Sequence, residues 1–158
     1  MNELIALAVE IQSFCVERGW KFCFIGGLVV QHWGEPRTTK DIDLWIRTDR
    51  ENAKAVFQAL TDFGAPIAGM TPDNFMDGTV FQMGQSPERI DILQQASGLD
   101  FDSAWEHRLE GFIDPETPAL VISRDDLIRN KLASGREQDL LDVKRLRAAE
   151  QTTKLPRR

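Results

Sequence analysis

Two aspartates separated by one residue are the feature of this sequence that most clearly suggests chemistry. Asp41 and Asp43 lie in the run DIDLWI, whose strict alternation of side chains predicts a strand. Both carboxylates would leave one face of that strand with their Cα atoms about 6.5–7 Å apart, while the opposite face is aliphatic. Neighbouring carboxylates repel each other unless a cation neutralises them, and hard oxygen ligands suit Mg²⁺ or Mn²⁺. The pair predicts a metal site, the alternative being that both aspartates simply face solvent.

A third aspartate, Asp91, lies in a second alternating run, residues 89–93. The isoleucines on either side of it share one face of this predicted strand, and Asp91 lies on the other. If the two strands are neighbours with their apolar faces aligned, Asp91 joins Asp41 and Asp43. Three carboxylates on adjacent strands can hold two metal ions about 3.5–4 Å apart, an arrangement that supports in-line displacement at phosphorus.

Gly26 and Gly27 follow a run typical of a buried strand, residues 20–25, and precede a short segment that we expect to be helical, residues 28–33. Glycines in that position let backbone N–H groups approach phosphate oxygens at the positive end of a helix. The pair is neither a Walker A loop nor a dinucleotide fingerprint, and its alternative is a plain turn. Further donors come immediately before the aspartates: Arg37, Thr38, Thr39 and Lys40.

Hydrophobic periodicity predicts the elements that must position these residues. A first helix precedes Gly19, and a second begins with a capping box at Thr48–Glu51 and ends at Gly64. We expect a loop over 65–77, a hairpin of strands 79–83 and 89–93 joined by 84–87, a strand over 119–122, a helix capped at Ser123 that ends at Gly135, and a last helix over 136–150. Residues 94–117 give no clear pattern.

Helices interleaved with strands, two of them antiparallel, indicate an α/β (α+β) fold with a mixed sheet and a helical C-terminus. We assign residues 1–158 to one domain, with a core of about 1–122, C-terminal helices over about 123–150 and a basic tail over 151–158. Cys15 and Cys23 lie on apolar patterns and are expected to be buried thiols rather than a disulfide or zinc ligands.

Composition and charge limit the classes of function. The chain has 158 residues, of which 42% are hydrophobic and 28% charged, and lacks a signal-peptide pattern or an apolar run of membrane-spanning length. We therefore expect a cytoplasmic protein with no membrane partner. The net charge is −6, but residues 1–128 carry −11 and residues 129–158 carry +5. The basic C-terminal segment suits a polyanionic ligand, or is simply a solvated helix and tail.

Several of these segments together resemble a known family. The first group comprises Gly26-Gly27, His32-Trp33-Gly34 and the run Arg37-Thr38-Thr39-Lys40-Asp41-Ile42-Asp43-Leu44, and it resembles the first motif of the polymerase-beta-like nucleotidyltransferase superfamily. The second group comprises residues 121–123, 126–128, 131–136, 139–140 and 142–143, and it resembles the C-terminal motif of the AbiEii-type branch of small bacterial proteins. One departure is Leu28, which stands where many members carry a Ser or Thr that meets a phosphate.

The resemblance implies roles for residues in both groups. It implies metal binding by Asp41, Asp43 and Asp91, and phosphate binding around Gly26-Gly27. It also implies a nucleotide contact from Lys131 and a supporting role for Asp139. The spacing agrees with a polar cluster there, because Arg136 lies just beyond the preceding helix and Asp139 and Asp142 share one face of the next.

The expected activity is that of a nucleotidyltransferase of the EC 2.7.7 type, which moves an NMP group from an NTP to a hydroxyl with two Mg²⁺ (or Mn²⁺) ions. The acceptor would be an RNA end such as that of tRNA, a protein or a small molecule. AbiEii-type relatives often act as toxins, so the resemblance also implies a toxin role and an antitoxin partner. Leu28 motivates an alternative, a catalytically silent nucleotide-binding or protein-interaction module. A third hypothesis is nucleic-acid binding through the basic C-terminal segment.

Overall fold

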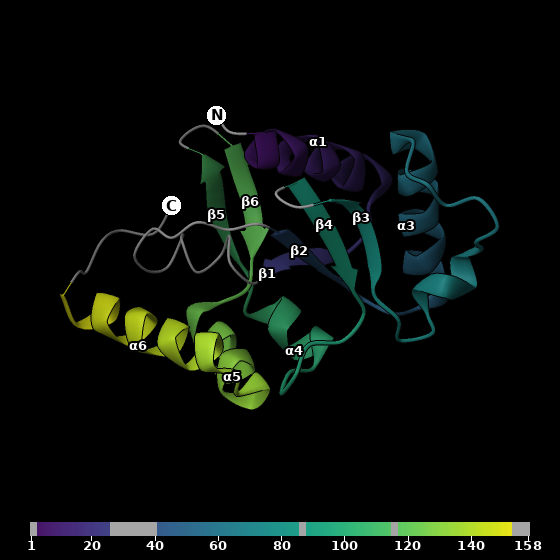
Figure 1. Ribbon diagram of the computed structural model, residues 1–158. Coiled ribbons are helices and arrows are strands. Elements are labelled where there is room, and N and C mark those ends of the chain that lie inside the picture. The colour runs from purple at the N-terminus through teal and green to yellow at the C-terminus, as the bar shows by residue number, and fades with distance from the viewer. Residues whose placement is uncertain (1–2, 26–40, 86–87, 115–116, 153–158) are drawn as a thin grey trace.

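A six-stranded mixed sheet organises the chain in the computed structural model, which describes residues 3–25, 41–85, 88–114 and 117–152 (Figure 1). The strands are β1 (Phe22–Ile25), β2 (Asp41–Ile46), β3 (Phe81–Gln85), β4 (Glu88–Leu93), β5 (Leu109–Asp114) and β6 (Thr117–Val121). Their order across the sheet is β3-β4-β2-β1-β6-β5. The pairs β2/β4 and β1/β6 are parallel and the other three are antiparallel, which confirms the predicted mixed sheet.

Helices lie on both sides of this sheet. They are α1 (Glu3–Arg18), α3 (Arg50–Phe63), the short 3₁₀ helix η1 (Pro72–Phe75), α4 (Phe101–Glu106), α5 (Arg124–Ser134) and α6 (Glu137–Thr152). In Figure 1, α1 and α3 lie on one side of the sheet and α4, α5 and α6 on the other. Gly64 and Gly135 end α3 and α5 with positive φ angles of 93° and 68°, as the sequence predicted. No helix in the described part of the chain is both long and apolar enough to cross a membrane.

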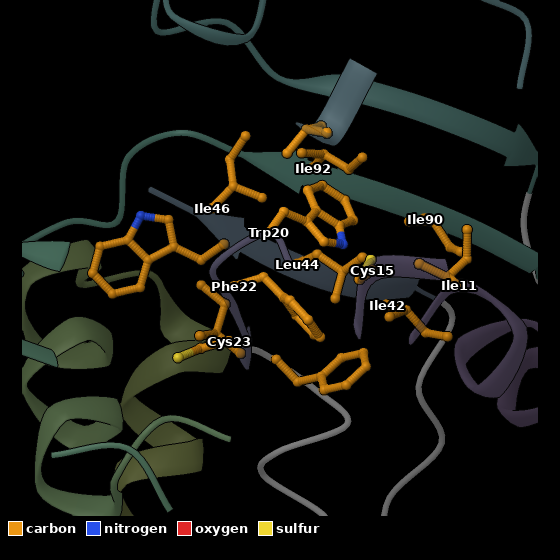
Figure 2. Packing of buried hydrophobic residues seen from close by; sticks show 14 of the residues in the cluster. Ile11, Cys15, Trp20, Phe22, Cys23, Ile42, Leu44, Ile46, Ile90 and Ile92 are labelled. Carbon is orange, nitrogen blue, oxygen red and sulfur yellow. The ribbon is translucent and has the colours of Figure 1, made fainter. Parts of the chain in front are cut away.

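The hydrophobic core packs the sheet against α1 and α3 on one side, and on the other side it includes Trp45, Leu127 and Leu146. The aliphatic face of β2 is fully buried on the side of α1 and α3, as its alternation predicted, and so is the matching face of β4. Figure 2 shows these side chains together with those of α1: Ile11, Cys15, Ile42, Leu44, Ile46, Ile90 and Ile92. Both cysteines are free and buried, as expected, and burial raises the pKa of each thiol.

Some boundaries differ from the predictions. Helix α3 is capped by Asp49, whose side chain accepts the Asn52 N–H, and not by Thr48. The reason is tertiary: Asn52 bonds the backbone of Lys21 and Arg47 at the neighbouring ends of β1 and β2, which fixes where the helix begins. Strand β3 begins two residues later than expected, the loop over 65–77 contains η1, and residues 94–117 contain α4 and β5.

Candidate active site

Strand pairing brings two of the predicted carboxylates side by side. Strands β2 and β4 are parallel neighbours in which Asp43 lies opposite Asp91. Since the residues flanking each aspartate point into the core, Asp43 and Asp91 leave the opposite face of the sheet. Asp91 is only 8% exposed, and Asp43 is half-buried. Asp41 begins β2 in register with Arg89, but its side chain lies outside the described part of the structure.

Arg89 forms an ion pair with the third predicted carboxylate. Its Nε lies 3.0 Å from Oδ1 of Asp91 and its Nη2 lies 3.3 Å from Oδ2, so both carboxylate oxygens contact one guanidinium. The two residues are two positions apart in β4 and therefore share the face that carries Asp43. Arg89 was not among the predicted site residues. Strand alternation was the signal that could have identified it.

A buried cluster of charges joins α5 to α6. Nζ of Lys131 lies 3.3 Å from Oδ1 of Asp139 and 3.3 Å from Oδ2 of Asp142. All three side chains are at most 7% exposed, whereas Arg136, whose Nε bonds Asp139 at 2.8 Å, is 77% exposed. Asp139 and Asp142 therefore share one face of α6, as their spacing in the sequence predicted, and both contact Lys131.

The surroundings of Asp139 keep its carboxylate ionised. Burial raises the pKa of Asp139, but the hydrogen bonds from Arg136 and Ser134 and the charge of Lys131 outweigh it and lower the pKa to about 2. The hydrogen bond to Asp139 raises the pKa of Arg136, with a smaller contribution from the carboxylate charge of Asp43. The guanidinium thus lies within electrostatic reach of the sheet carboxylate as well as of its own helix.

One pocket of about 170 Å³ connects the sheet to this cluster. Asp43 lines it from β2, and Lys131, Arg136 and Asp139 line it from the helical pair, although about ninety positions separate them in the sequence. The other lining residues are Ile25, Leu93, Gln95, Ala96, Ser97, Asn130 and Ser134. The structure therefore brings four of the predicted site residues together, and Asp91 lies beside Asp43 on the adjacent strand.

The predicted phosphate-binding residues cannot be placed in the same way. Gly26, Gly27, Arg37, Thr38 and Thr39 lie outside the described residues, as do Leu28 and Lys40. Ile25, which lines the pocket and lies opposite Asp43 in the sheet, is the residue directly before Gly26.

Two of the three carboxylates that are predicted to bind metal have described side chains. Among the described side chains, no three acidic, His or Cys residues are close enough together to hold a metal ion. The predicted trio includes Asp41, whose side chain lies outside the described part of the structure. The two that are placed, Asp43 and Asp91, offer hard carboxylate oxygens on adjacent strands, which suits Mg²⁺ or Mn²⁺.

Residues 2–153 match a protein family described as "Nucleotidyltransferase of unknown function (DUF6036)". The chain belongs to this nucleotidyltransferase family. Among solved structures, the fold of this nucleotidyltransferase is similar to that of the antibiotic-resistance factor ANT(2'')-Ia, with a TM-score of 0.62 and 14% identity over 92% of this chain and 83% of that one. No functionally curated protein matches the sequence at a significant level. The predicted superfamily and fold are confirmed, while the comparisons give no support for the AbiEii-type branch.

The prediction missed several residues that line the pocket of this nucleotidyltransferase. Gln95, Ala96 and Ser97 follow β4 in a segment with no recognisable motif, so no signal in the sequence could have identified them. Asn130 adjoins Lys131 on α5, and its side chain donates to the Ser97 carbonyl at 3.0 Å. This bond ties the segment after β4 to the helix that carries the cluster.

Proposed function

We propose that the protein transfers a nucleoside monophosphate from an NTP to a hydroxyl acceptor in a metal-dependent reaction. The observation that supports this most strongly is the pocket shared by Asp43, Lys131, Arg136 and Asp139. This pocket has a carboxylate of the sheet on one wall and an exposed guanidinium on another. A bound triphosphate and its metal ions need this combination of charges. Membership of a nucleotidyltransferase family supports the same reaction class.

The carboxylates and the cations would have separate roles. Asp41, Asp43 and Asp91 would hold two Mg²⁺ (or Mn²⁺) ions, which when bound neutralise the triphosphate and favour ionisation of the acceptor hydroxyl. Gly26, Gly27, Arg37, Thr38 and Thr39 are proposed to contact the triphosphate. On the opposite wall, the exposed guanidinium of Arg136 is better placed for a phosphate than the Lys131 ammonium, which two carboxylates already share. Asp139 orients Arg136 through their hydrogen bond.

In the reaction, the acceptor oxygen forms a bond to the α-phosphorus while the bond from that phosphorus to the β-phosphate oxygen breaks. Pyrophosphate leaves with the electron pair of the broken bond, and the hydroxyl proton passes to a carboxylate of the site. Asp139 takes no proton in this scheme, because its pKa is too low for it to act as a base near neutral pH.

Label transfer with a matched pair of variants tests this proposal. Each α-labelled NTP is incubated with Mg²⁺ or Mn²⁺ and with bulk tRNA, protein or small hydroxyl compounds. The wild type and Asp125→Asn, an exposed acid on α5 outside the pocket, should transfer label equally. Asp43→Asn keeps the shape and removes the charge, and should lower the rate by about 10³-fold or more. The proposal fails if no combination transfers label or if Asp43→Asn transfers it as fast as the wild type.

The bidentate contact of Arg89 with Asp91 favours a second candidate, a catalytically silent nucleotide-binding or protein-interaction module. In such a module a cation of the protein neutralises the third carboxylate in place of a metal ion. A silent nucleotide-binding module would gain thermal stability from NTP with Mg²⁺ and transfer no label to any acceptor. Turnover with any acceptor contradicts this candidate.

The toxin role, the antitoxin partner and the AbiEii-type branch stay predictions that come from the resemblance alone. The same holds for tRNA as acceptor, whereas the cytoplasmic location stays a prediction that comes from the composition of the sequence. A toxin that modifies tRNA would label bulk tRNA in the assay above and would arrest growth when expressed without its partner. The label-transfer experiment therefore also decides between the acceptors.

A further inference from the structure

A second pocket, of about 720 Å³, adjoins the candidate active site. Gln95, Ala96 and Ser97 line both pockets, so the segment after β4 is a wall that they share. Trp45 lines the larger pocket. It lies two residues after Asp43 in β2, so both side chains leave the same face of that strand. A ligand bound in the larger pocket would lie next to the proposed site of transfer, and the volume is within the usual range of small-molecule pockets, about 300–1,000 Å³.

Aromatic side chains form one wall of this pocket. Trp45 is 2% exposed, and its ring meets that of Phe101 edge to face at a centroid distance of 4.9 Å. The indole N–H of Trp45 is buried and has no hydrogen-bond acceptor among the described residues. A buried donor without an acceptor costs about 1–3 kcal/mol, so a small shift of the ring that lets this N–H reach an oxygen of a ligand in the pocket would be stabilising.

The charged residues of the pocket are mostly acidic. Asp49, Asp100 and Asp102 line it together with one base, Arg47. Nε of Arg47 lies 3.1 Å from Asp49 and 3.3 Å from Asp102, so this guanidinium is already shared between two carboxylates. Asp100 uses Oδ2 to accept the Ser103 N–H at 3.0 Å as the cap of α4, and its Oδ1 has no partner in the described part of the chain. The lining therefore has an excess of two negative charges.

We propose that this pocket binds the acceptor, and that the acceptor is a small polyhydroxyl compound carrying protonated amines. The proposal rests on the proposed function. Carboxylates and aromatic rings both attract ammonium groups, and a hydroxyl oxygen would accept the free Trp45 N–H. An RNA end brings phosphates, which the acidic lining repels. The shared wall directs a hydroxyl of the bound compound toward the pocket that contains Asp43.

Calorimetric titration of the whole protein without NTP tests this proposal. The probes are kanamycin as a cationic polyol, raffinose as a neutral sugar, and a short RNA with a free 3′ hydroxyl. The variant Asp100→Asn/Asp102→Asn removes two charges and keeps the cap of α4, because Asn caps helices as well as Asp does. Glu106→Gln, an exposed acid at the end of the same helix and outside the pocket, is the matched control.

The wild type and Glu106→Gln should bind kanamycin equally, and the double variant should bind it at least about tenfold more weakly. Trp45→Phe keeps a ring and removes the N–H, and should weaken binding of kanamycin several-fold while the thermal unfolding transition stays cooperative. Equal binding by the double variant and the wild type, or tighter binding of RNA or raffinose than of kanamycin, overturns the proposal.

The two proposals fail in different ways. Kanamycin binding that depends on Asp100 and Asp102, with no label transfer from any NTP, overturns the transfer reaction and leaves the cation site standing. Label transfer to RNA or protein with no kanamycin binding overturns the acceptor pocket and leaves the reaction standing. Asp43→Asn should abolish transfer without changing kanamycin affinity, because Asp43 does not line the larger pocket.

Discussion

The two faces of the sheet are both buried, but by different chemistry. Under α1, the face that carries Ile42, Leu44 and Ile46 excludes water with aliphatic side chains that are fully buried. On the side of α5 and α6, the buried groups include Asp91 and the cluster of Lys131 with its two aspartates. Burial of apolar surface stabilises a fold directly, whereas buried ion pairs contribute little net stability because of the cost of desolvation.

This difference indicates where the sequence serves stability and where it serves function. A well-packed apolar cluster in place of a buried ion pair is often neutral or stabilising, so stability alone does not explain why the charges lie there. The charges are concentrated on the face that also carries Asp43 and the shared pocket. We therefore propose that the charged side is the functional one, and three experiments test the contrast.

The largest expected effect is a loss of stability when one buried side chain is shortened or neutralised on each face of the sheet. Lys131→Met leaves two buried carboxylates without their shared cation and should lower the free energy of unfolding by about 3–5 kcal/mol. Leu44→Ala opens a cavity on the apolar face and should cost about 2–5 kcal/mol. Urea denaturation at neutral pH measures both, with Lys54→Met on the exposed side of α3 as the control.

A compensating variant separates the two mechanisms. Lys131→Met/Asp139→Asn/Asp142→Leu removes the whole set of charges and should recover much of the stability lost in Lys131→Met, because no buried charge remains unpaired. If Lys131→Met lowered the free energy of unfolding by less than about 1 kcal/mol, the two buried aspartates would not need the Lys131 ammonium as their partner.

The next effect is a pH dependence that comes from Asp139 on the charged face. The pKa of Asp139 is about 2 in the folded protein against an ordinary value of 3.8. Its ionised form therefore stabilises the fold above pH 3.8, and this contribution is lost as the pH falls from 3.8 to about 2. The contribution is on the order of 2 kcal/mol.

Asp139→Asn should flatten the stability profile over this range, as measured by thermal unfolding between pH 2 and pH 6. Leu44→Ala should shift the whole profile downward and leave its slope unchanged, because no titrating group is altered. A slope for Asp139→Asn that equals the wild-type slope would contradict the assignment of the acid-sensitive contribution to this carboxylate.

The sequence predicted the features that depend on local periodicity. The alternation in β2 and β4 predicted which face carries Asp43 and Asp91, and the i, i+3 spacing predicted that Asp139 and Asp142 share one face of the last helix. Glycine at position 135 predicted the end of α5 because few other residues adopt its positive φ.

The missed features depend on tertiary arrangement. Gln95, Ala96 and Ser97 line two pockets only because the chain after β4 turns beneath α5, and nothing in their own sequence indicates this. Helix α4 has six residues, too few for a helical period to be recognised. The position of the α3 cap followed from the contacts of Asn52 with two strands, which outweighed the local capping pattern.

The smallest expected effect concerns metal affinity on the charged face. Because Arg89 engages both oxygens of Asp91, a metal ion that binds Asp91 must displace a guanidinium. Arg89→Met removes this competitor and should raise the affinity for Mn²⁺ by up to about tenfold, since a partly exposed ion pair contributes about 1 kcal/mol or less and the loss of its positive charge adds to the gain. Mn²⁺ titration followed by electron paramagnetic resonance measures the affinity without turnover.

Arg50→Met is the control for this measurement, because Arg50 is exposed on α3 and its nearest acid, Asp73, is also exposed. It makes the net charge of −6 one unit more negative, as Arg89→Met does, so any general increase in cation attraction appears in both variants. Affinity that rises equally in both would assign the effect to overall charge. Affinity that falls in Arg89→Met alone would mean that Arg89 orients Asp91 for the metal ion, and the ion pair would then be part of the site and not its competitor.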